Sequence, residues 1–165
     1  MTALRWLIRI VLALVAAVAL LFLVSRFADG PLVAPIPGGP LVSGEEVSEP
    51  VTDWAFAREV GEIELQLASQ TSSRTTWILL LDGQAYVPCS LGFPPGKSWY
   101  KEAAADGRAT LRIEGKRYPV TLTKLDDAAV QQMEATVRAE VTRKYGREPP
   151  SGAGGGVWLF RVESR

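Results

Sequence analysis

The sequence predicts an α+β protein: one N-terminal transmembrane helix, then a small, mostly antiparallel β-barrel that carries two or three helices. Three observations support this fold class. A single unbroken apolar run lies near the N-terminus. Behind a stretch rich in proline and glycine, segments of strict apolar–polar alternation are joined by turn residues, a pattern typical of hairpins. Segments with helical periodicity interrupt these strands, as expected for helices packed outside a barrel.

The apolar run from Ile10 to Val24, taken with its flanks, is long enough to cross a bilayer. A spanning helix needs about 20 mostly apolar residues, and residues 4–27 supply them, with Trp6 and Phe27 where interfacial aromatics are expected. Arg5 and Arg9 precede the run, whereas Arg26 and then several acidic residues follow it, so the positive-inside rule predicts a cytoplasmic N-terminus and an extracytoplasmic, periplasmic domain. A cleaved signal peptide is the alternative, although the exit at Arg26 lacks the small residues that a cleavage site prefers.

Composition excludes several classes of function. The chain has 18 Lys and Arg against 18 Asp and Glu, so no basic field points to nucleic acid, and we expect no such partner. It has no histidine, which excludes Ser-His-Asp and Cys-His catalysis and imidazole metal sites. Cys89 is the single cysteine, which excludes an internal disulfide and a cysteine-cluster zinc site. We therefore expect no bound metal, and any chemistry rests on hydroxyls, carboxylates, Lys, Arg, Tyr or a cofactor.

Prolines and glycines recur through residues 28–52. They cannot hold a regular helix or an inner strand, so the segment is predicted to be a linker, with a plain spacer as the simplest interpretation. This divides the chain into an anchor over residues 1–27, the linker, and a barrel domain over residues 53–165.

The barrel domain opens with a short helix and two strands. Asp53 is placed to cap a helix over residues 54–57. Residues 62–67 alternate strictly and predict a strand with one face in water. Residues 75–81 are β-branched, aromatic and nearly all apolar, which predicts one continuous strand buried on both faces.

The Asp82-Gly83 pair that follows is a strong signal for a type I′ hairpin turn, which leads into a strand over residues 84–87. Residues 90–97 read as a Gly/Pro loop. Ser98 is then placed to cap a short helix, which Gly107 closes.

A second hairpin follows this helix. Residues 109–114 and 118–122 alternate on either side of a turn predicted at Gly115-Lys116. Pro119 has no backbone donor, so its strand is predicted to lie at a sheet edge or to contain a bulge.

The longest helix of the domain is predicted between a cap at Asp126 and a stop at Gly146. Its apolar residues form one stripe. A flexible loop over residues 148–156 and a final strand over residues 157–162 complete the domain. The stripe consists of Val130, Met133, Val137, Val141 and Tyr145.

This order of elements resembles the split β-barrel superfamily that binds flavins and deazaflavins, which includes pyridoxamine-phosphate-oxidase-like proteins and deazaflavin-dependent nitroreductases. The resemblance covers about Asp53 to Val162. It rests on the strand at 77–81 with its Asp82-Gly83 turn and Tyr86-Val87, the Lys97-Ser98-Trp99-Tyr100 helix start, the hairpin at 107–116, and the closing strand at 157–162.

The resemblance implies bound FMN or deazaflavin, nitroreductase- or quinone-reductase-like oxidoreductase activity, and pairing into a homodimer. It names no catalytic residue. The family's Gly- and Lys-rich motif ending in Pro-Arg is replaced here by residues 69–76, where only Arg74 matches. The implied cofactor-binding residues are Arg74, Thr75, Lys97, Ser98 and Trp99.

That incomplete motif leaves two functions open: a non-catalytic interaction module of the cell envelope, or a flavin- or deazaflavin-dependent oxidoreductase. Residues 92–98 resemble a phosphate loop but are one residue short of the G-x-x-x-x-G-K-S spacing, and their two prolines remove backbone donors. A looser anion site at Lys97 and Ser98 remains open beside a plain helix cap with a solvated lysine. Without a histidine to activate it, Cys89 is interpreted as a buried, inert thiol.

Overall fold

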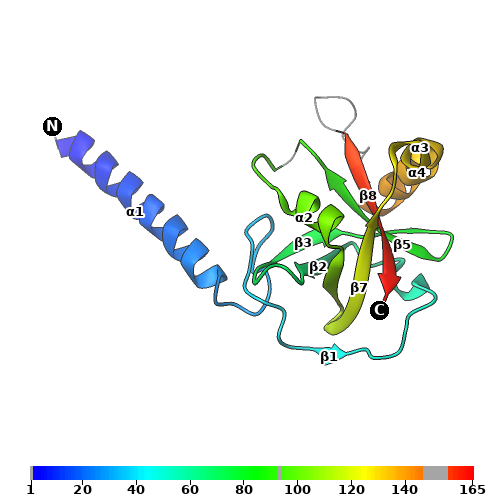
Figure 1. Cartoon of the computed structure of the whole chain (residues 1–165). Coiled ribbons are helices and arrows are strands. Elements are labelled where there is room, and N and C mark those ends of the chain that lie inside the picture. The colour runs from blue at the N-terminus through cyan, green and yellow to red at the C-terminus, as the bar shows by residue number, and fades with distance from the viewer. Residues whose placement is uncertain (1, 93, 147–155) are drawn as a thin grey trace.

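The computed structural model describes residues 2–92, 94–146 and 156–165 and confirms the α+β fold class (Figure 1). In chain order the elements are α1 (Thr2–Ser25), β1 (Glu45–Glu46), the 3₁₀ turn η1 (Ala55–Ala57), β2 (Glu62–Leu67), β3 (Ser73–Trp77), β4 (Leu79–Leu81), β5 (Gln84–Ser90), α2 (Trp99–Ala105), β6 (Arg108–Ile113), β7 (Lys116–Lys124), α3 (Asp127–Gln132), α4 (Glu134–Tyr145) and β8 (Val157–Ser164).

The strands form one curled sheet in the order β3-β2-β6-β7-β8-β5-β4. Neighbours along this path are antiparallel, whereas β1 pairs with β7 in parallel. The strands at the two ends of the order, β3 and β4, are consecutive in the chain. The sheet therefore curls back on itself as a half-barrel.

The continuous strand predicted over residues 75–81 is wrong, because the chain breaks into β3 and β4 at Ile78. β3 pairs with β2 and is mostly half-buried, while β4 pairs with β5 and is fully buried. One straight strand could not serve both ends of a curled sheet. The Ile78 carbonyl instead accepts hydrogen bonds from Lys144 Nζ at 2.9 Å and the Tyr145 hydroxyl at 3.1 Å.

Both hairpin turns use left-handed backbone. Asp82 and Gly83 have φ of 50° and 79°, which confirms the predicted type I′ turn. In the second hairpin the left-handed residues are Glu114 and Gly115, with φ of 49° and 79°. The second turn therefore lies one residue earlier than predicted.

The prediction that the Pro119 strand lies at an edge or a bulge is also wrong. β7 lies inside the sheet, between β6 and β8, and Pro119 keeps its register opposite Thr110. The Pro119 carbonyl accepts from the Arg165 backbone N–H at 3.0 Å, so the proline nitrogen also faces β8. Pro119 lies just outside the paired part of β7 and β8, because the first residue pair between these strands is Val120 with Ser164. The missing donor therefore costs the ladder little.

The short helices start close to their predicted positions. Asp53 accepts the Ala55 backbone N–H at 2.9 Å, ahead of the single turn η1. Ser98 precedes α2, but its side chain makes no capping hydrogen bond. Gly107 does not close α2 in a left-handed conformation: it lies so close to the Leu122 carbonyl that a methyl group would collide with it.

The predicted long helix is broken at Met133 into α3 and α4. Its termini are confirmed: the Asp126 carboxylate accepts the Ala129 backbone N–H at 2.7 Å, and Gly146 is left-handed at φ 63°. The predicted apolar stripe packs on the outer face of the sheet. The loop predicted over residues 148–156 falls, apart from Gly156, outside the described residues.

Apolar side chains gather on both faces of the curled sheet. The concave face holds a large cluster with Leu65, Leu111 and Phe160 at its centre, against which α2 packs Trp99 and Ala103. The outer cluster packs α4 against the opposite face of the sheet. Beside it the rings of Trp77 and Tyr145 stack, with 3.9 Å between their centroids. The buried members of the outer cluster are Leu79, Leu81, Tyr86, Val141 and Leu159.

Helix α1 projects away from the half-barrel, on the side opposite α3 and α4 (Figure 1). Residues Leu4–Ser25 are long and apolar enough to cross a membrane, and none of the most apolar window is buried against the domain. A signal sequence has the same length and composition, so this observation leaves cleavage and orientation as predictions.

The segment after α1 does not behave as the predicted plain spacer. Residues 26–47, here called the strap, run across the sheet and pair with it at two places. Gly38 exchanges backbone hydrogen bonds with Ser73 of β3, at 2.9 and 3.2 Å. Farther along, Glu45 and Glu46 form β1 beside β7. The sequence boundaries at residues 27 and 52 remain predictions.

Candidate functional site

The residue expected to hold a cofactor phosphate, Arg74, points toward the concave face of the half-barrel. It lies in β3 directly opposite Leu65, and opposed residues of an antiparallel pair share a face. Leu65 belongs to the concave cluster and is fully buried. The Arg74 guanidinium carbon lies 5.4 Å from the ring centroid of Trp99, within cation–π range.

Two polar side chains connect this guanidinium to a carboxylate. Arg74 Nη2 donates to Gln70 Oε1, and Gln70 Nε2 donates to Glu102 Oε2 at 2.6 Å. Burial lowers the pKa of Arg74, while the charge of Glu102 raises it in part. Arg74 Nε is buried and has no hydrogen-bond partner among the residues that the structure describes. The guanidinium is thus held in place but not fully satisfied.

Cys89 and Lys97 complete this cluster. Cys89 is 2% exposed, on the concave face, as the interpretation of a buried thiol requires. Burial raises the pKa of this thiol, and Lys97 and Arg74 oppose that shift through charge and, for Lys97, a hydrogen bond. A protonated, buried thiol is a poor nucleophile. Cys89 therefore lies between Lys97 and Arg74 as a buried neighbour with little reactivity.

The structure brings three of the five predicted cofactor residues together: Arg74, Lys97 and Trp99. Ser98 adjoins them in sequence but is exposed. Thr75 does not join them, because it lies opposite Glu64 and so points to the outer face of the sheet.

Three members of the cluster were not predicted from the sequence: Gln70, Cys89 and Glu102. For Cys89 the sequence did contain a signal: the alternation of side chains along β3 and β5 places both Arg74 and Cys89 on the inner face of the sheet. Gln70 and Glu102 come from a turn and a helix. Local periodicity does not relate those two elements to each other.

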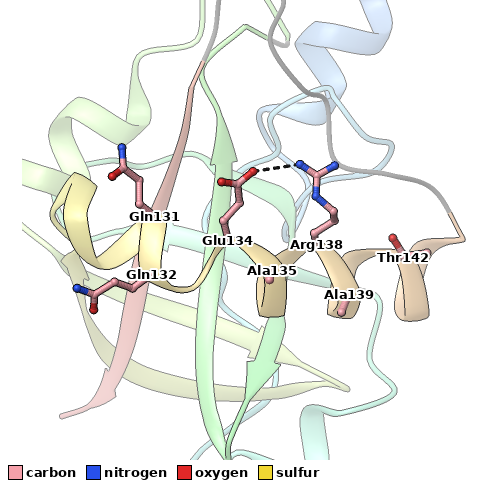
Figure 2. Close-up of a pocket in the computed structure, with 7 residues that line it drawn as sticks. All are labelled: Gln131, Gln132, Glu134, Ala135, Arg138, Ala139 and Thr142. Carbon is pink, nitrogen blue, oxygen red and sulfur yellow. Dashed lines mark hydrogen bonds and ion pairs between the residues drawn. The ribbon is translucent and has the colours of Figure 1, made fainter.

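A hollow of about 620 Å³ lies elsewhere, on the outer side of α3 and α4. Figure 2 shows its polar lining, with the Glu134–Arg138 ion pair at 3.1 Å across it. It is shallow and open, and it contains none of the predicted cofactor residues. Within the described residues, no group of acidic or cysteine side chains is arranged to hold a metal ion.

Comparison with known proteins gives little more. No family model matches the chain, and no curated protein matches it. Among solved structures, a NimC/NimA family protein from Clostridium acetobutylicum is similar at 14% identity, with a TM-score of 0.42 over 65% of this chain and 75% of the other. At this TM-score the likeness carries no argument about the fold or the activity of this chain.

Proposed function

We propose that this chain is a single-pass membrane protein whose half-barrel is a non-catalytic interaction module on the extracytoplasmic side of the membrane, where it also pairs with a second copy. The observation that carries the proposal is the state of Arg74. The side chain expected to bind a cofactor phosphate is engaged inside the half-barrel, on Trp99 and on the Gln70–Glu102 pair.

These contacts compete with a phosphate. Gln70 occupies Arg74 Nη2, so a phosphate that used this donor would have to displace Gln70 or share it, and it would lie near the carboxylate of Glu102, which repels it. The hydroxyl of Thr75 is on the other face and cannot help. The predicted pair of Arg74 and Thr75 is therefore not assembled around one phosphate position.

The membrane part of the proposal rests on α1 and on charge. The span ends at Ser25. Arg5 and Arg9 precede its unbroken apolar run from Ile10 to Val24, and Arg26 and then Asp29 follow it. The positive-inside rule then favours an N-terminus in the cytoplasm and a half-barrel outside. A periplasmic reporter fused after residue 165 should be active, and an inactive reporter would overturn this orientation.

One observation favours the alternative, a flavin- or deazaflavin-dependent oxidoreductase of this fold. Arg74 Nε is a buried donor without a partner in the described part of the chain, and it lies in the same cluster as Lys97 and Trp99. A buried unsatisfied donor is costly unless a bound group completes it. A flavin would supply the redox chemistry itself, and these residues would only hold it.

Titration of the full chain, purified in detergent micelles, with FMN and separately with a deazaflavin separates the two functions. The interaction module predicts a colourless protein with no saturable binding. Saturable binding that is lost in both Arg74→Met and Lys97→Met would establish the enzyme instead.

Arg161→Met is the matched control, because Arg161 Nε is also buried with no partner among the described residues, but it belongs to β8 and not to this cluster. Binding that is lost equally in this control would not be assigned to the Arg74 cluster. Light scattering of the same sample should give the mass of two chains, and a monomer would contradict the pairing.

A further inference from the structure

The strap carries exposed apolar side chains immediately beyond the membrane span. Phe27 is 84% exposed, and Leu32 and Val33 are 51% and 56% exposed. Val42, farther along the strap, is 67% exposed. Large side chains that are exposed singly are ordinary, but a group of them within a short segment marks a surface that meets another apolar phase.

This group is fixed to the end of α1 by close packing. Ser25 is fully buried, and its hydroxyl donates to the Pro37 carbonyl. Gly38 lies against the Gly30 carbonyl so closely that a methyl group there would collide with it, and Gly39 lies equally close to Ala28. The loop that presents Leu32 and Val33 is therefore folded back against the last turn of the helix.

The same segment is fixed to the sheet. Arg112 of β6 donates from Nη1 to the Asp29 carboxylate at 2.8 Å and from Nη2 to the Asp29 carbonyl at 2.9 Å. The Asp29 carboxylate also accepts the Val42 backbone N–H at 2.8 Å. Leu41, between these contacts and β2, is 5% exposed, and its N–H donates to Gln66 at 2.8 Å. The strap thus joins the helix to the half-barrel without a free linker.

We propose that the strap surface formed by Phe27, Leu32 and Val33 lies in the interface of the bilayer that α1 crosses, and that it holds the half-barrel against the membrane in one orientation. The proposal rests on α1 being a membrane span, as in the proposed function. Its occupant is the lipid surface, because these side chains begin two residues after the span ends and belong to a loop whose base packs against the end of α1.

The backbone of the loop suits this environment. Pro31, Pro35 and Pro37 have no N–H groups, so they leave fewer donors to desolvate at the edge of the hydrocarbon region. Arg26 is exposed beside the loop and can place its guanidinium among lipid phosphates. An apolar face beside a basic residue is the arrangement of segments that lie in a membrane interface.

The test uses the full chain in vesicles of phosphatidylcholine and phosphatidylglycerol. In a Cys89→Ala background, a polarity-sensitive fluorophore is attached to one new thiol at a time, in Leu32→Cys, Val33→Cys, Leu14→Cys or Gln132→Cys. Leu14 lies in the middle of α1. Gln132 is exposed on α3, on the far side of the half-barrel, and serves as the matched aqueous control (Figure 1).

We expect a blue shift and a loss of iodide quenching at positions 14, 32 and 33, relative to position 132, and quenching at 32 and 33 by lipids labelled near the headgroup. If position 14 is protected by lipid but positions 32 and 33 are as accessible to iodide as position 132, the inference is overturned. The membrane span itself would then still stand. An aqueous position 14 would overturn both the inference and the membrane part of the proposed function.

Discussion

Two arginines on neighbouring parts of the sheet have opposite surroundings. Arg112, on the outer face, forms ion pairs with Glu64 and with Asp29, and its hydrogen bond to Glu64 raises its pKa. Arg74, on the concave face, contacts Trp99 and Gln70, and its buried Nε has no partner in the part of the chain that the structure describes. Burial lowers the pKa of Arg74.

The difference shows what each arginine contributes to the fold. The environment of Arg112 favours its charge, so that charge holds β6, β2 and the strap together. The environment of Arg74 opposes its charge. The contacts with Trp99 and Gln70 offset only part of the free energy needed to bury that charge. We therefore expect the outer arginine to stabilise the fold and the inner one to be nearly dispensable for it.

The largest expected effect is that of Arg112→Ala. The side chain of Arg112 is 9% exposed, and its removal leaves Glu64 and Asp29 close together without a cation. Breaking such a pair should lower the free energy of unfolding by about 3 kcal/mol. Urea unfolding of the full chain in detergent micelles measures this loss, and a loss no greater than that of Arg74→Met would contradict the comparison.

Asp29→Asn tests the strap half of the same network and its pH dependence. The pKa of Asp29 is held below its ordinary value of 3.8 by the Ser43 hydroxyl first, then the Val42 N–H and Arg112. A carboxylate with a lowered folded-state pKa stabilises the protein above its ordinary pKa, and this contribution is lost as the pH falls below it.

The variant should therefore cost about 1 kcal/mol at pH 7. The difference from the wild type should shrink only below about pH 4. Unfolding curves recorded at several pH values measure it. A difference that instead disappears between pH 7 and 5 would show that Asp29 is not the titrating group.

Arg74→Met should change stability little. Methionine retains a flexible apolar stem against Trp99 and removes the buried charge, and replacing a buried charge by an apolar group is often neutral or stabilising. We expect a change within about 0.5 kcal/mol in the same urea assay. A loss comparable with that of Arg112→Ala would mean that the inner arginine is a structural support as well.

The smallest effect should come from Arg108→Ala, although Arg108 makes three side-chain hydrogen bonds to Asp106, at 2.7 to 3.2 Å. Both side chains lie in water, at 60% and 38% exposure. Exposed pairs contribute little, so no change in the unfolding midpoint is expected. A clear shift would show that hydrogen bonding, rather than burial, governs the arginines of this sheet.

Local patterns predicted the elements whose determinants are local. Strict alternation gave β2 at residues 62–67, and the left-handed turn at Asp82-Gly83 needed only its own dipeptide. The break at Ile78 was not predictable in this way, because it arises from the closure of the whole sheet. The even apolar character of residues 75–81 gives no sign of it.

The candidate site divides along the same line. Arg74, Lys97 and Trp99 were implied by the resemblance to the split-barrel superfamily, and the structure brings them together. Their partners Gln70 and Glu102 are 32 residues apart, and they meet only because a turn and a helix pack at one end of the half-barrel. The strap was missed for a similar reason, because prolines and glycines indicate where regular structure stops but not what the chain then contacts.

The Asp29–Arg112 contact joins residues 83 positions apart, and this separation sets an order of events during synthesis. At about 5–20 residues per second, Arg112 is made several seconds after Asp29. Asp29 is therefore made before β6 and β7, which supply part of the surface that receives the strap. The newborn chain passes through a stage in which the first helix has been made and the Asp29–Arg112 contact cannot yet form, so the strap gains this attachment only after β6 is synthesised.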